Sequence, residues 1–166
     1  MKNKLLPITV AIALGCCAAA AADEVPAGAK PIKQIPMTNS FPTLVSVRYM
    51  IDDVDAAVTF YTKYFGFTLE QDASPAFASV TRGNLRLLLS GPKSSGRRPL
   101  PDGTKPVPGG WNRIELPVAD IQAEAARLRA AGVKFRRDDI VTGPGGAQIW
   151  VVDPSGNLIE LFQAKE

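Results

Sequence analysis

The chain of 166 residues contains no histidine, and its two cysteines, Cys16 and Cys17, stand side by side near its start. Without histidine, no Ser-His-Asp or Cys-His set of catalytic residues can form. A non-haem iron site of the two-histidine, one-carboxylate kind is excluded for the same reason. Any chemistry of this protein therefore proceeds without an imidazole base or an imidazole ligand.

The first 22 residues have the pattern of a cleaved secretory signal. Lys2 and Lys4 precede an apolar run that starts at Leu5, and small residues end the segment at Ala22. We expect cleavage after Ala22 and export to the periplasm or the medium. The remaining chain then has no cysteine and forms no disulfide, even in an oxidising compartment.

Two other interpretations of this segment stay open. Cys16 or Cys17 could carry a lipid anchor, with Leu14 at the third position before Cys17. That arrangement places a cysteine directly before Cys17, where a small residue is expected. An uncleaved anchor would have to use an alanine-rich run that barely reaches across a bilayer. We therefore expect a soluble exported protein, without membrane insertion once the signal is cleaved.

The formal charge of +3 does not indicate a nucleic-acid partner. Loss of Lys2 and Lys4 with the signal leaves a charge of +1 on the mature chain. Arg97 and Arg98 have too few aromatic neighbours to form a nucleic-acid surface. The expected partner is a small molecule.

The chain after the signal begins with a tether and then repeats itself. Residues 23–43 are rich in proline and poor in large apolar side chains, which is typical of a linker. Residues 46–67 and 113–135 then each predict a strand followed by a helix, because their apolar residues keep helical spacing. The expected N-caps are Asp53 and Asp120, and the expected helix ends are Gly66 and Gly132.

The second halves of the two copies also match. "GNLRLLLS" at residues 83–90 aligns without a gap with "GNLIELFQ" at residues 156–163. Each copy therefore predicts a strand, a helix, and two or three antiparallel strands. Because one copy alone leaves a sheet face uncovered, we expect the two to pack together. The predicted fold is α+β, with one curved eight-stranded mixed sheet, helices on its outer face and a concave inner face.

A long irregular segment joins the two copies. Residues 91–110 are rich in glycine and proline and carry four basic residues, including Arg97 and Arg98, against Asp102 alone. Such segments in compact domains are usually binding loops or linkers. We expect a solvated linker, with a basic lid over the concave face as the alternative.

The paired βαβββ units, "DDVDAAVTFYTKYFGF" and the closing "DPSGNLIELF" resemble the vicinal oxygen chelate superfamily. It includes glyoxalase I, the extradiol dioxygenases and the bleomycin-resistance proteins, and it hosts several chemistries as well as members that only bind. The resemblance covers residues 43–164, as modules 43–90 and 110–164 joined by a loop at 91–109. Members often dimerise, so the resemblance also implies a homodimer.

The resemblance identifies four positions that hold the metal in the metal-dependent members. They are seven residues before each capping aspartate and four residues after each hairpin glycine. In this sequence they are Ser46, Leu87, Arg113 and Glu160. Only Glu160 is a competent ligand, because leucine cannot coordinate and arginine is not deprotonated in proteins. We therefore expect no metal and no other cofactor.

Glu160 is the only charged residue in an otherwise apolar strand, and Arg113 is expected opposite it. A guanidinium there would replace the positive charge of the metal and could grip the carboxylate through two hydrogen bonds. The pair could serve stability alone, because breaking a buried ion pair costs about 3–5 kcal/mol. It could also bind a ligand. Glu160 is the only candidate for a catalytic group.

Strand alternation predicts which side chains line the concave face. Leu85, Leu87 and Leu89 are expected on it, and Trp150 on the helix-packed side. Trp111 is expected either in the core, which we favour, or as a stacking platform. The predicted ligand-binding residues are Arg48, Leu87, Trp111, Arg113, Glu115, Glu160 and Phe162.

Three functions follow from these expectations. The first is an exported protein that binds a small, partly apolar molecule, which can also be anionic, without a catalytic metal. The second is a lactoylglutathione-lyase-like or dioxygenase-like enzyme, with a divalent metal at a non-standard site or with Glu160 as a base. The third is a scaffold whose sheet edges or concave face meet another protein.

Overall fold

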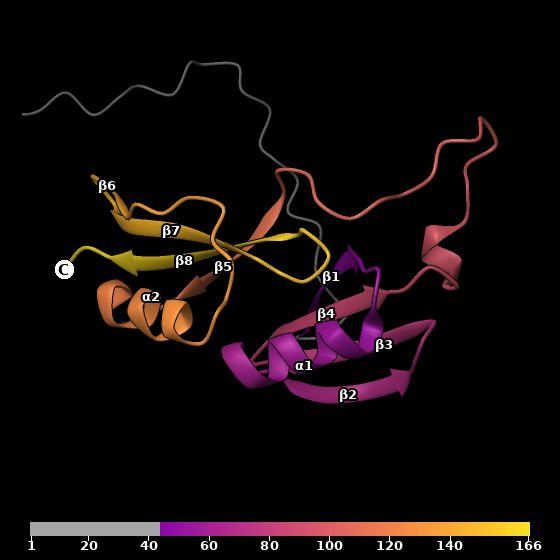
Figure 1. Ribbon diagram of the computed structural model, residues 1–166, viewed down its shortest axis with the longest axis horizontal. Coiled ribbons are helices and arrows are strands. Elements are labelled where there is room, and N and C mark those ends of the chain that lie inside the picture. The colour runs from indigo at the N-terminus through magenta and orange to yellow at the C-terminus, as the bar shows by residue number, and fades with distance from the viewer. Residues whose placement is uncertain (1–43) are drawn as a thin grey trace, which may run out of the picture. The chain divides into compact units, whose positions relative to one another are not determined.

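A computed structural model describes residues 44–166, which form two consecutive βαβββ modules (Figure 1). The predicted signal at 1–22 and tether at 23–43 lie outside the described residues. Module 1 consists of β1 (Val45–Met50), α1 (Val54–Phe65), β2 (Thr68–Ala73), β3 (Phe77–Arg82) and β4 (Leu85–Ser90). Module 2 consists of β5 (Arg113–Pro117), α2 (Ile121–Ala130), β6 (Val141–Gly143), β7 (Gly146–Val152) and β8 (Leu158–Ala164). The α+β class and the tandem modules are confirmed.

The eight strands form two four-stranded sheets, where the sequence predicted a single one. Sheet 1 has the order β1-β4-β3-β2, and sheet 2 has the order β5-β8-β7-β6. A tyrosine side chain bridges the two sheets: the Tyr49 hydroxyl donates to the carbonyl of Leu158 and accepts from the amide of Ile114, both at 2.9 Å. Because the Tyr49 phenol meets the free edge of β5, a polar side-chain contact links the sheets there.

Both helices begin where the sequence predicts, and α1 ends at the predicted Gly66, whereas the C-cap of α2 is Ala131, one residue before the predicted Gly132. The Asp53 carboxylate accepts a hydrogen bond from the amide of Ala56, and Asp120 does the same for Ala123. These caps satisfy amides that have no partner within the helix. Gly66 ends α1 at φ 66°, a left-handed conformation that glycine adopts at little cost.

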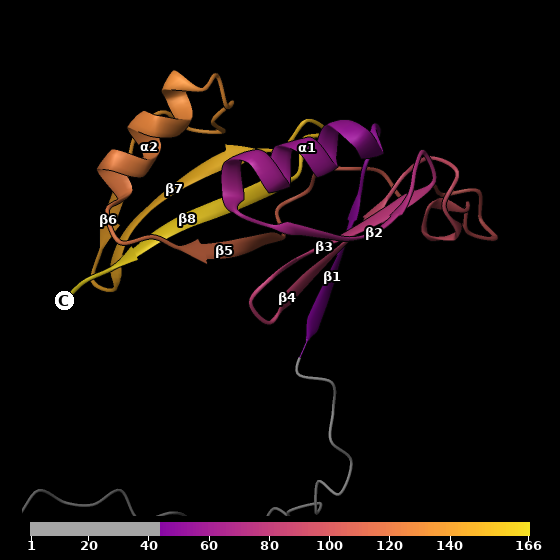
Figure 2. The same ribbon diagram turned by 90° about the horizontal axis from the view of Figure 1, so that it is seen from below.

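The helices lie on the same side of the two sheets, so each sheet has one face that no helix covers (Figure 2). Buried apolar side chains of both modules form the core, in which α1 packs on β2, β3 and β4, and α2 packs on β7 and β8. None of the described helices is long and apolar enough to cross a membrane. We call the surface of each sheet opposite its helix the helix-free face.

The register of β4 differs by one residue from the prediction. Ser46 pairs with Arg86, whereas the corresponding Arg113 pairs with Leu158. Leu87 is completely buried against α1, and Leu88 takes the place that corresponds to Glu160. The gapless alignment fails because two residues link β3 to β4, whereas five residues link β7 to β8. Since a one-residue shift moves side chains to the opposite face, Leu85, Leu87 and Leu89 all leave the predicted site.

A buried aspartate joins the modules beside Tyr49. Asp153, in the β7–β8 loop, accepts hydrogen bonds from the Tyr61 hydroxyl of α1, from the amides of Ser155 and Asn157, and from the Asn157 side chain. The Asn157 amide group also donates to the carbonyl of Met50. Burial raises the pKa of Asp153, against the lowering effect of the Asn157 hydrogen bonds. Burial also raises the pKa of Tyr61.

Alkaline pH is expected to weaken the contact between the modules. Burial raises the pKa of Tyr49 from 10.0 to about 12. Between these values the unfolded chain has lost the phenol proton and the folded protein keeps it, so stability falls as pH rises from about 10 to 12. One proton corresponds to roughly 1.4 kcal/mol per pH unit.

The Tyr49→Phe variant tests this expectation. Stability is measured by urea unfolding at pH 8 and pH 11. At pH 8 the variant should be less stable than wild type by about 1–3 kcal/mol, because the amide of Ile114 and the carbonyl of Leu158 lose a partner. Its decline towards pH 11 should be shallower, while Tyr61 still contributes. An equal decline in the two proteins would show that Tyr49 is not the titrating group.

Candidate functional site

The candidate site starts from an ion pair on the helix-free face of sheet 2. Arg113 in β5 donates from Nε to the Oε2 atom of Glu160 in β8. Glu160 is 7% exposed, and the Arg113 side chain is 29% exposed. The two lie together because Glu115 pairs with Glu160 in the parallel ladder, and Arg113 lies two residues before it on the same face. A buried carboxylate thus contacts a partly exposed cation.

Trp150 lies beside the ion pair, on the helix-free face and not on the predicted helix-packed face. It is the cross-strand partner of Glu160 in β7, so it lies on the helix-free face. The Arg113 guanidinium stands 4.4 Å from the centre of its ring, which is a cation–π contact. Its indole N–H is buried and finds no acceptor among residues 44–166. The run "QIWVV" is apolar at too many positions for alternation to show which face Trp150 occupies.

Trp111 lies beside Trp150 on the surface. The preferred prediction, which placed it in the core, is wrong. It is 67% exposed, and its ring meets that of Trp150 edge-on, with centroids 6.4 Å apart. Arg136 stands 5.7 Å from the Trp111 ring and Arg137 the same distance from the Trp150 ring. Both indoles therefore have a guanidinium at or near their rings.

The sequence analysis did not identify Arg136 and Arg137 as site residues. Arg137 pairs with Asp139, at 2.8 Å. The backbone around Phe135 pairs with the part of β7 that β6 leaves unpaired. The amide of Arg136 donates to the carbonyl of Trp150, and the amide of Val152 donates to the carbonyl of Lys134. This pairing carries Arg136 to the tryptophans. An apolar residue between basic ones, Lys134 and Arg136, was the available signal for an extra strand.

Two of the predicted ligand-binding residues lie elsewhere. Leu87 is buried against α1, as described above. Arg48 lies on the helix-free face of sheet 1, where it donates to the Ser90 hydroxyl at 2.5 Å and packs on Gly96. The other five share the helix-free face of sheet 2 or the residue leading into it: Trp111, Arg113, Glu115, Glu160 and Phe162.

The residues at the former metal positions do not fit a metal ion. With the corrected register they are Ser46, Leu88, Arg113 and Glu160. Leucine offers no donor atom, and the permanent cation of Arg113 already holds a Glu160 oxygen. A catalytic zinc site needs three protein ligands. Within residues 44–166, no three histidine, cysteine, aspartate or glutamate side chains gather in a way that could hold an ion.

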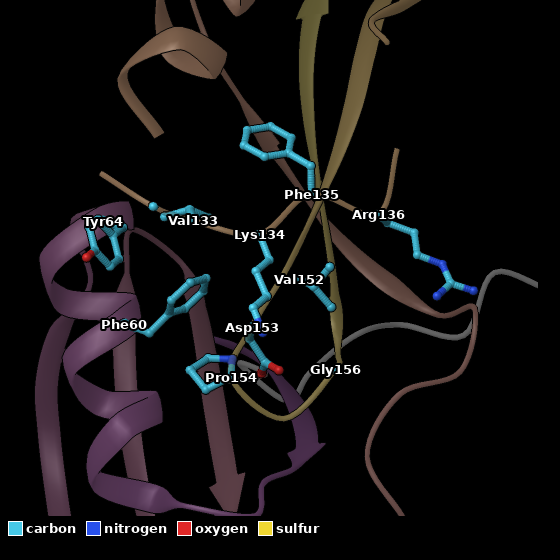
Figure 3. A pocket seen from close by; sticks show the side chains of 11 residues that line it. Phe60, Tyr64, Val133, Lys134, Phe135, Arg136, Val152, Asp153, Pro154 and Gly156 are labelled. Atoms are coloured by element: carbon cyan, nitrogen blue, oxygen red, sulfur yellow. The ribbon is translucent and has the colours of Figure 1, made fainter. Parts of the chain in front are cut away.

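A groove of about 320 Å³ adjoins the ion pair at the end of sheet 2. Trp111 and Arg136 border it, Val152 and Leu158 contribute apolar surface, and glycines supply much of the rest. A second cavity, of about 600 Å³, lies between α1 and the segment after α2, and it shares Arg136, Val152 and Gly156 with the groove. Figure 3 shows this second cavity, with Phe60 and Tyr64 of α1 facing Lys134 and Pro154.

The segment between the modules is fixed at both ends. Arg97 donates to the carbonyl of Ile51 and to the carboxylate of Asp52, at 3.0 and 2.9 Å. At the other end, the amide of Gly109 donates to the Asn157 side chain at 2.9 Å. Arg97, counted among the basic residues of the predicted lid, is therefore held at the end of β1.

The ion pair with Trp150 can supply charge, a ring face and a hydrogen-bond donor to a bound molecule.

Comparisons with known proteins agree with this architecture. Residues 43–161 match the family model of the Glyoxalase/Bleomycin resistance protein/Dioxygenase superfamily. YwbC of Bacillus subtilis (strain 168) is 27% identical over 120 residues, which cover 69% of this chain and 91% of YwbC.

Two solved structures are also similar to the chain. TnmS3, an antibiotic binding protein from Streptomyces sp. CB03234, is 26% identical with a TM-score of 0.58, covering 76% of this chain and 99% of TnmS3. A lactoylglutathione lyase from Agrobacterium tumefaciens has the same TM-score at 22% identity, covering 72% of this chain and 92% of its own. The second likeness concerns the fold alone.

Proposed function

Because the chain belongs to the Glyoxalase/Bleomycin resistance protein/Dioxygenase superfamily, we propose that it is an exported protein that binds a small, partly apolar molecule without a catalytic metal. The molecule lies on the helix-free face of sheet 2, against Arg113, Trp150 and Glu160. This chain acts by holding its ligand, as a sequestering or resistance protein does, and it works as a homodimer.

The observation that carries the proposal is the contact of Arg113 with both Glu160 and Trp150. A guanidinium held by a carboxylate and an aromatic ring is fixed in place, so it loses little conformational freedom when it binds. It is also partly exposed, so it can meet a ligand. Fixed polar groups beside apolar surface are typical of small-molecule sites.

The similarity to TnmS3 supports a binding function over an enzymatic one. TnmS3 is described as an antibiotic binding protein, and the chain covers nearly all of it. The likeness to the lactoylglutathione lyase is lower in identity and adds no catalytic residue to this chain. The metal-dependent form of the enzyme alternative does not fit the corrected set of Ser46, Leu88, Arg113 and Glu160.

The first test is elemental analysis of the full chain, expressed without a histidine tag and purified without chelator. We expect less than about a tenth of an equivalent of nickel, zinc, iron or manganese, because one carboxylate beside an arginine is too weak a site. Close to one equivalent, lost together with Glu160 in a Glu160→Gln variant, would make a metal-dependent enzyme the better explanation.

The second test is a ligand screen by thermal shift, in which compounds that raise the melting temperature are titrated by calorimetry. Arg113→Gln should weaken binding of any such compound by about tenfold or more, because a charge-assisted hydrogen bond is lost. Arg86→Gln, which removes an arginine paired with Glu70 on the helix-free face of sheet 1, is the matched control. Equal affinity in wild type and Arg113→Gln would remove Arg113 from the site.

A further inference from the structure

The two tryptophans of the chain, Trp111 and Trp150, lie in the same cluster. Trp150 belongs to the site of the proposed function, but Trp111 leads away from it into the adjoining groove. Trp111 is 67% exposed, and it does not stand alone, because its ring lies beside that of Trp150 and borders the groove. An exposed aromatic ring at the border of a hollow is a surface that a small molecule can contact.

The walls of the groove are held in place by hydrogen bonds. On one side, the amide of Gly109, which lies two residues before Trp111, donates a hydrogen bond to the Asn157 side chain. On the other side, the amide of Arg136 is bonded to the carbonyl of Trp150. In Figure 3 the Arg136 side chain extends away from Phe60 and Tyr64, although its residue also lines the second cavity. The groove is a built feature of the fold.

The surface chemistry of the groove is suited to a flat ring. Trp111 offers an exposed indole, and Val152 and Leu158 add apolar contacts. Gly110 and Gly156 have no side chain to fill the space, and a Cβ built on either would contact nothing within 4 Å. Aromatic rings stack on indoles in offset or edge-on arrangements. A volume of about 320 Å³ is at the small end of the range for ligand sites.

The charge of the groove is suited to an anion. Within the described part of the chain, Arg137 is paired with Asp139 and Arg113 with Glu160, whereas Arg136 has no carboxylate within salt-bridge distance. Its guanidinium stands over Trp111, so a ring stacked on that indole would bring a substituent within its reach. Guanidinium groups bind carboxylates and similar planar anions through paired hydrogen bonds.

We propose that the groove between Trp111 and Arg136 is a subsite for a planar aromatic anion, such as an aryl carboxylate or sulfonate. The ring stacks on Trp111, and the anionic group binds Arg136. This inference rests on the proposed function and specifies its ligand: an aromatic acid whose remainder extends over Trp150 and Arg113.

The two indole N–H signals in a ¹H–¹⁵N spectrum of the full chain provide the test, because there is one for each tryptophan. Trp111→Phe and Trp150→Phe assign them. Titration with 2-naphthoate should shift the Trp111 signal saturably. Neutral 2-naphthylmethanol and aliphatic octanoate should bind at least about tenfold more weakly, because each lacks one of the two features.

Variants then separate the two groups. Arg136→Gln and Trp111→Ala should each weaken 2-naphthoate binding by about tenfold or more, and Arg136→Lys should retain part of it. Arg129→Gln is the matched control, because Arg129 lies over the ring of Phe135 at 4.7 Å, outside the groove. Trp111 is exposed, so its loss should leave the fold intact.

The other outcomes are distinct. A shift of the Trp150 signal alone would overturn the subsite and leave the proposed binding face in place. Equal binding of the alcohol would overturn the anionic part, and equal binding of octanoate the aromatic part. A Trp111 signal that responds only to protein concentration would identify an interface between copies of the chain. If neither signal moves with 2-naphthoate, the subsite is wrong, and the ligand screen decides separately on the proposed function.

Discussion

Replacement of Asp153 by alanine is expected to destabilise the protein by about 3 kcal/mol. The carboxylate accepts four hydrogen bonds of 2.8–3.0 Å, from Tyr61, Ser155 and Asn157, and it is only 4% exposed. A buried donor that loses its acceptor costs about 1–3 kcal/mol. Because burial raises the pKa of Asp153, its ionised form already carries a cost at neutral pH, and the measured loss is the net of the two effects.

Urea unfolding measures this loss, with Asp72→Ala as the matched control. Asp72 is exposed and accepts a single backbone hydrogen bond, from Ser74 at 2.9 Å. Its removal should cost much less than that of Asp153, because water can replace an exposed hydrogen-bond partner. If Asp153→Ala were as mild as this control, the hydrogen bonds of Asp153, three within the β7–β8 loop and one from Tyr61 of α1, would not be what holds this loop in place.

The Arg113–Glu160 pair is expected to show a large coupling in a double-mutant cycle. Arg113→Met leaves Glu160 buried without its cation and should cost about 2–4 kcal/mol. Glu160→Met should cost less, because the Arg113 side chain is 29% exposed and can reach water. The double variant should lie within about 1 kcal/mol of wild type, because apolar residues of similar size often replace a buried ion pair without loss.

The pair between Arg86 and Glu70 on sheet 1 is the control for this cycle. Its side chains are 32% and 36% exposed, and it should show a much smaller coupling than the Arg113–Glu160 pair, because solvent screens exposed charges. Binding distinguishes a structural role from a functional one. If the stable double variant binds the screened ligand as tightly as wild type, the pair serves the fold alone, and the proposed site loses the observation that carries it.

At Asp153, the local sequence predicts a turn but not the long-range contact of the side chain. The sequence predicts the Asp-Pro-Ser-Gly turn, and the amide of Gly156 does donate to the carbonyl of Asp153 at 3.0 Å. That the same aspartate reaches Tyr61, 92 residues away in the chain, depends on how the modules pack. No periodicity within one module carries that information.

The candidate site was predictable only in part. Arg113 and Glu160 could be placed on one face because the family resemblance gives them corresponding positions, seven residues before a capping aspartate and four residues after a hairpin glycine. Trp150 could not, because its strand is apolar on both sides. Trp111 and Arg136 come together through an irregular segment that pairs with the edge of β7. Whether such a segment finds a free strand edge depends on the path of the whole chain.

The sequence alone determined the tandem βαβββ modules, the helix caps and the absence of any histidine-based site, because these depend on residue type and short-range spacing. The tertiary structure decided what depends on strand pairing. The two-residue turn before β4 placed Leu88, and not Leu87, at the position that corresponds to Glu160, whereas the five-residue loop before β8 kept Glu160 beside Arg113. Because one residue of register exchanges the two faces of a strand, loop length decided which side chains face the site.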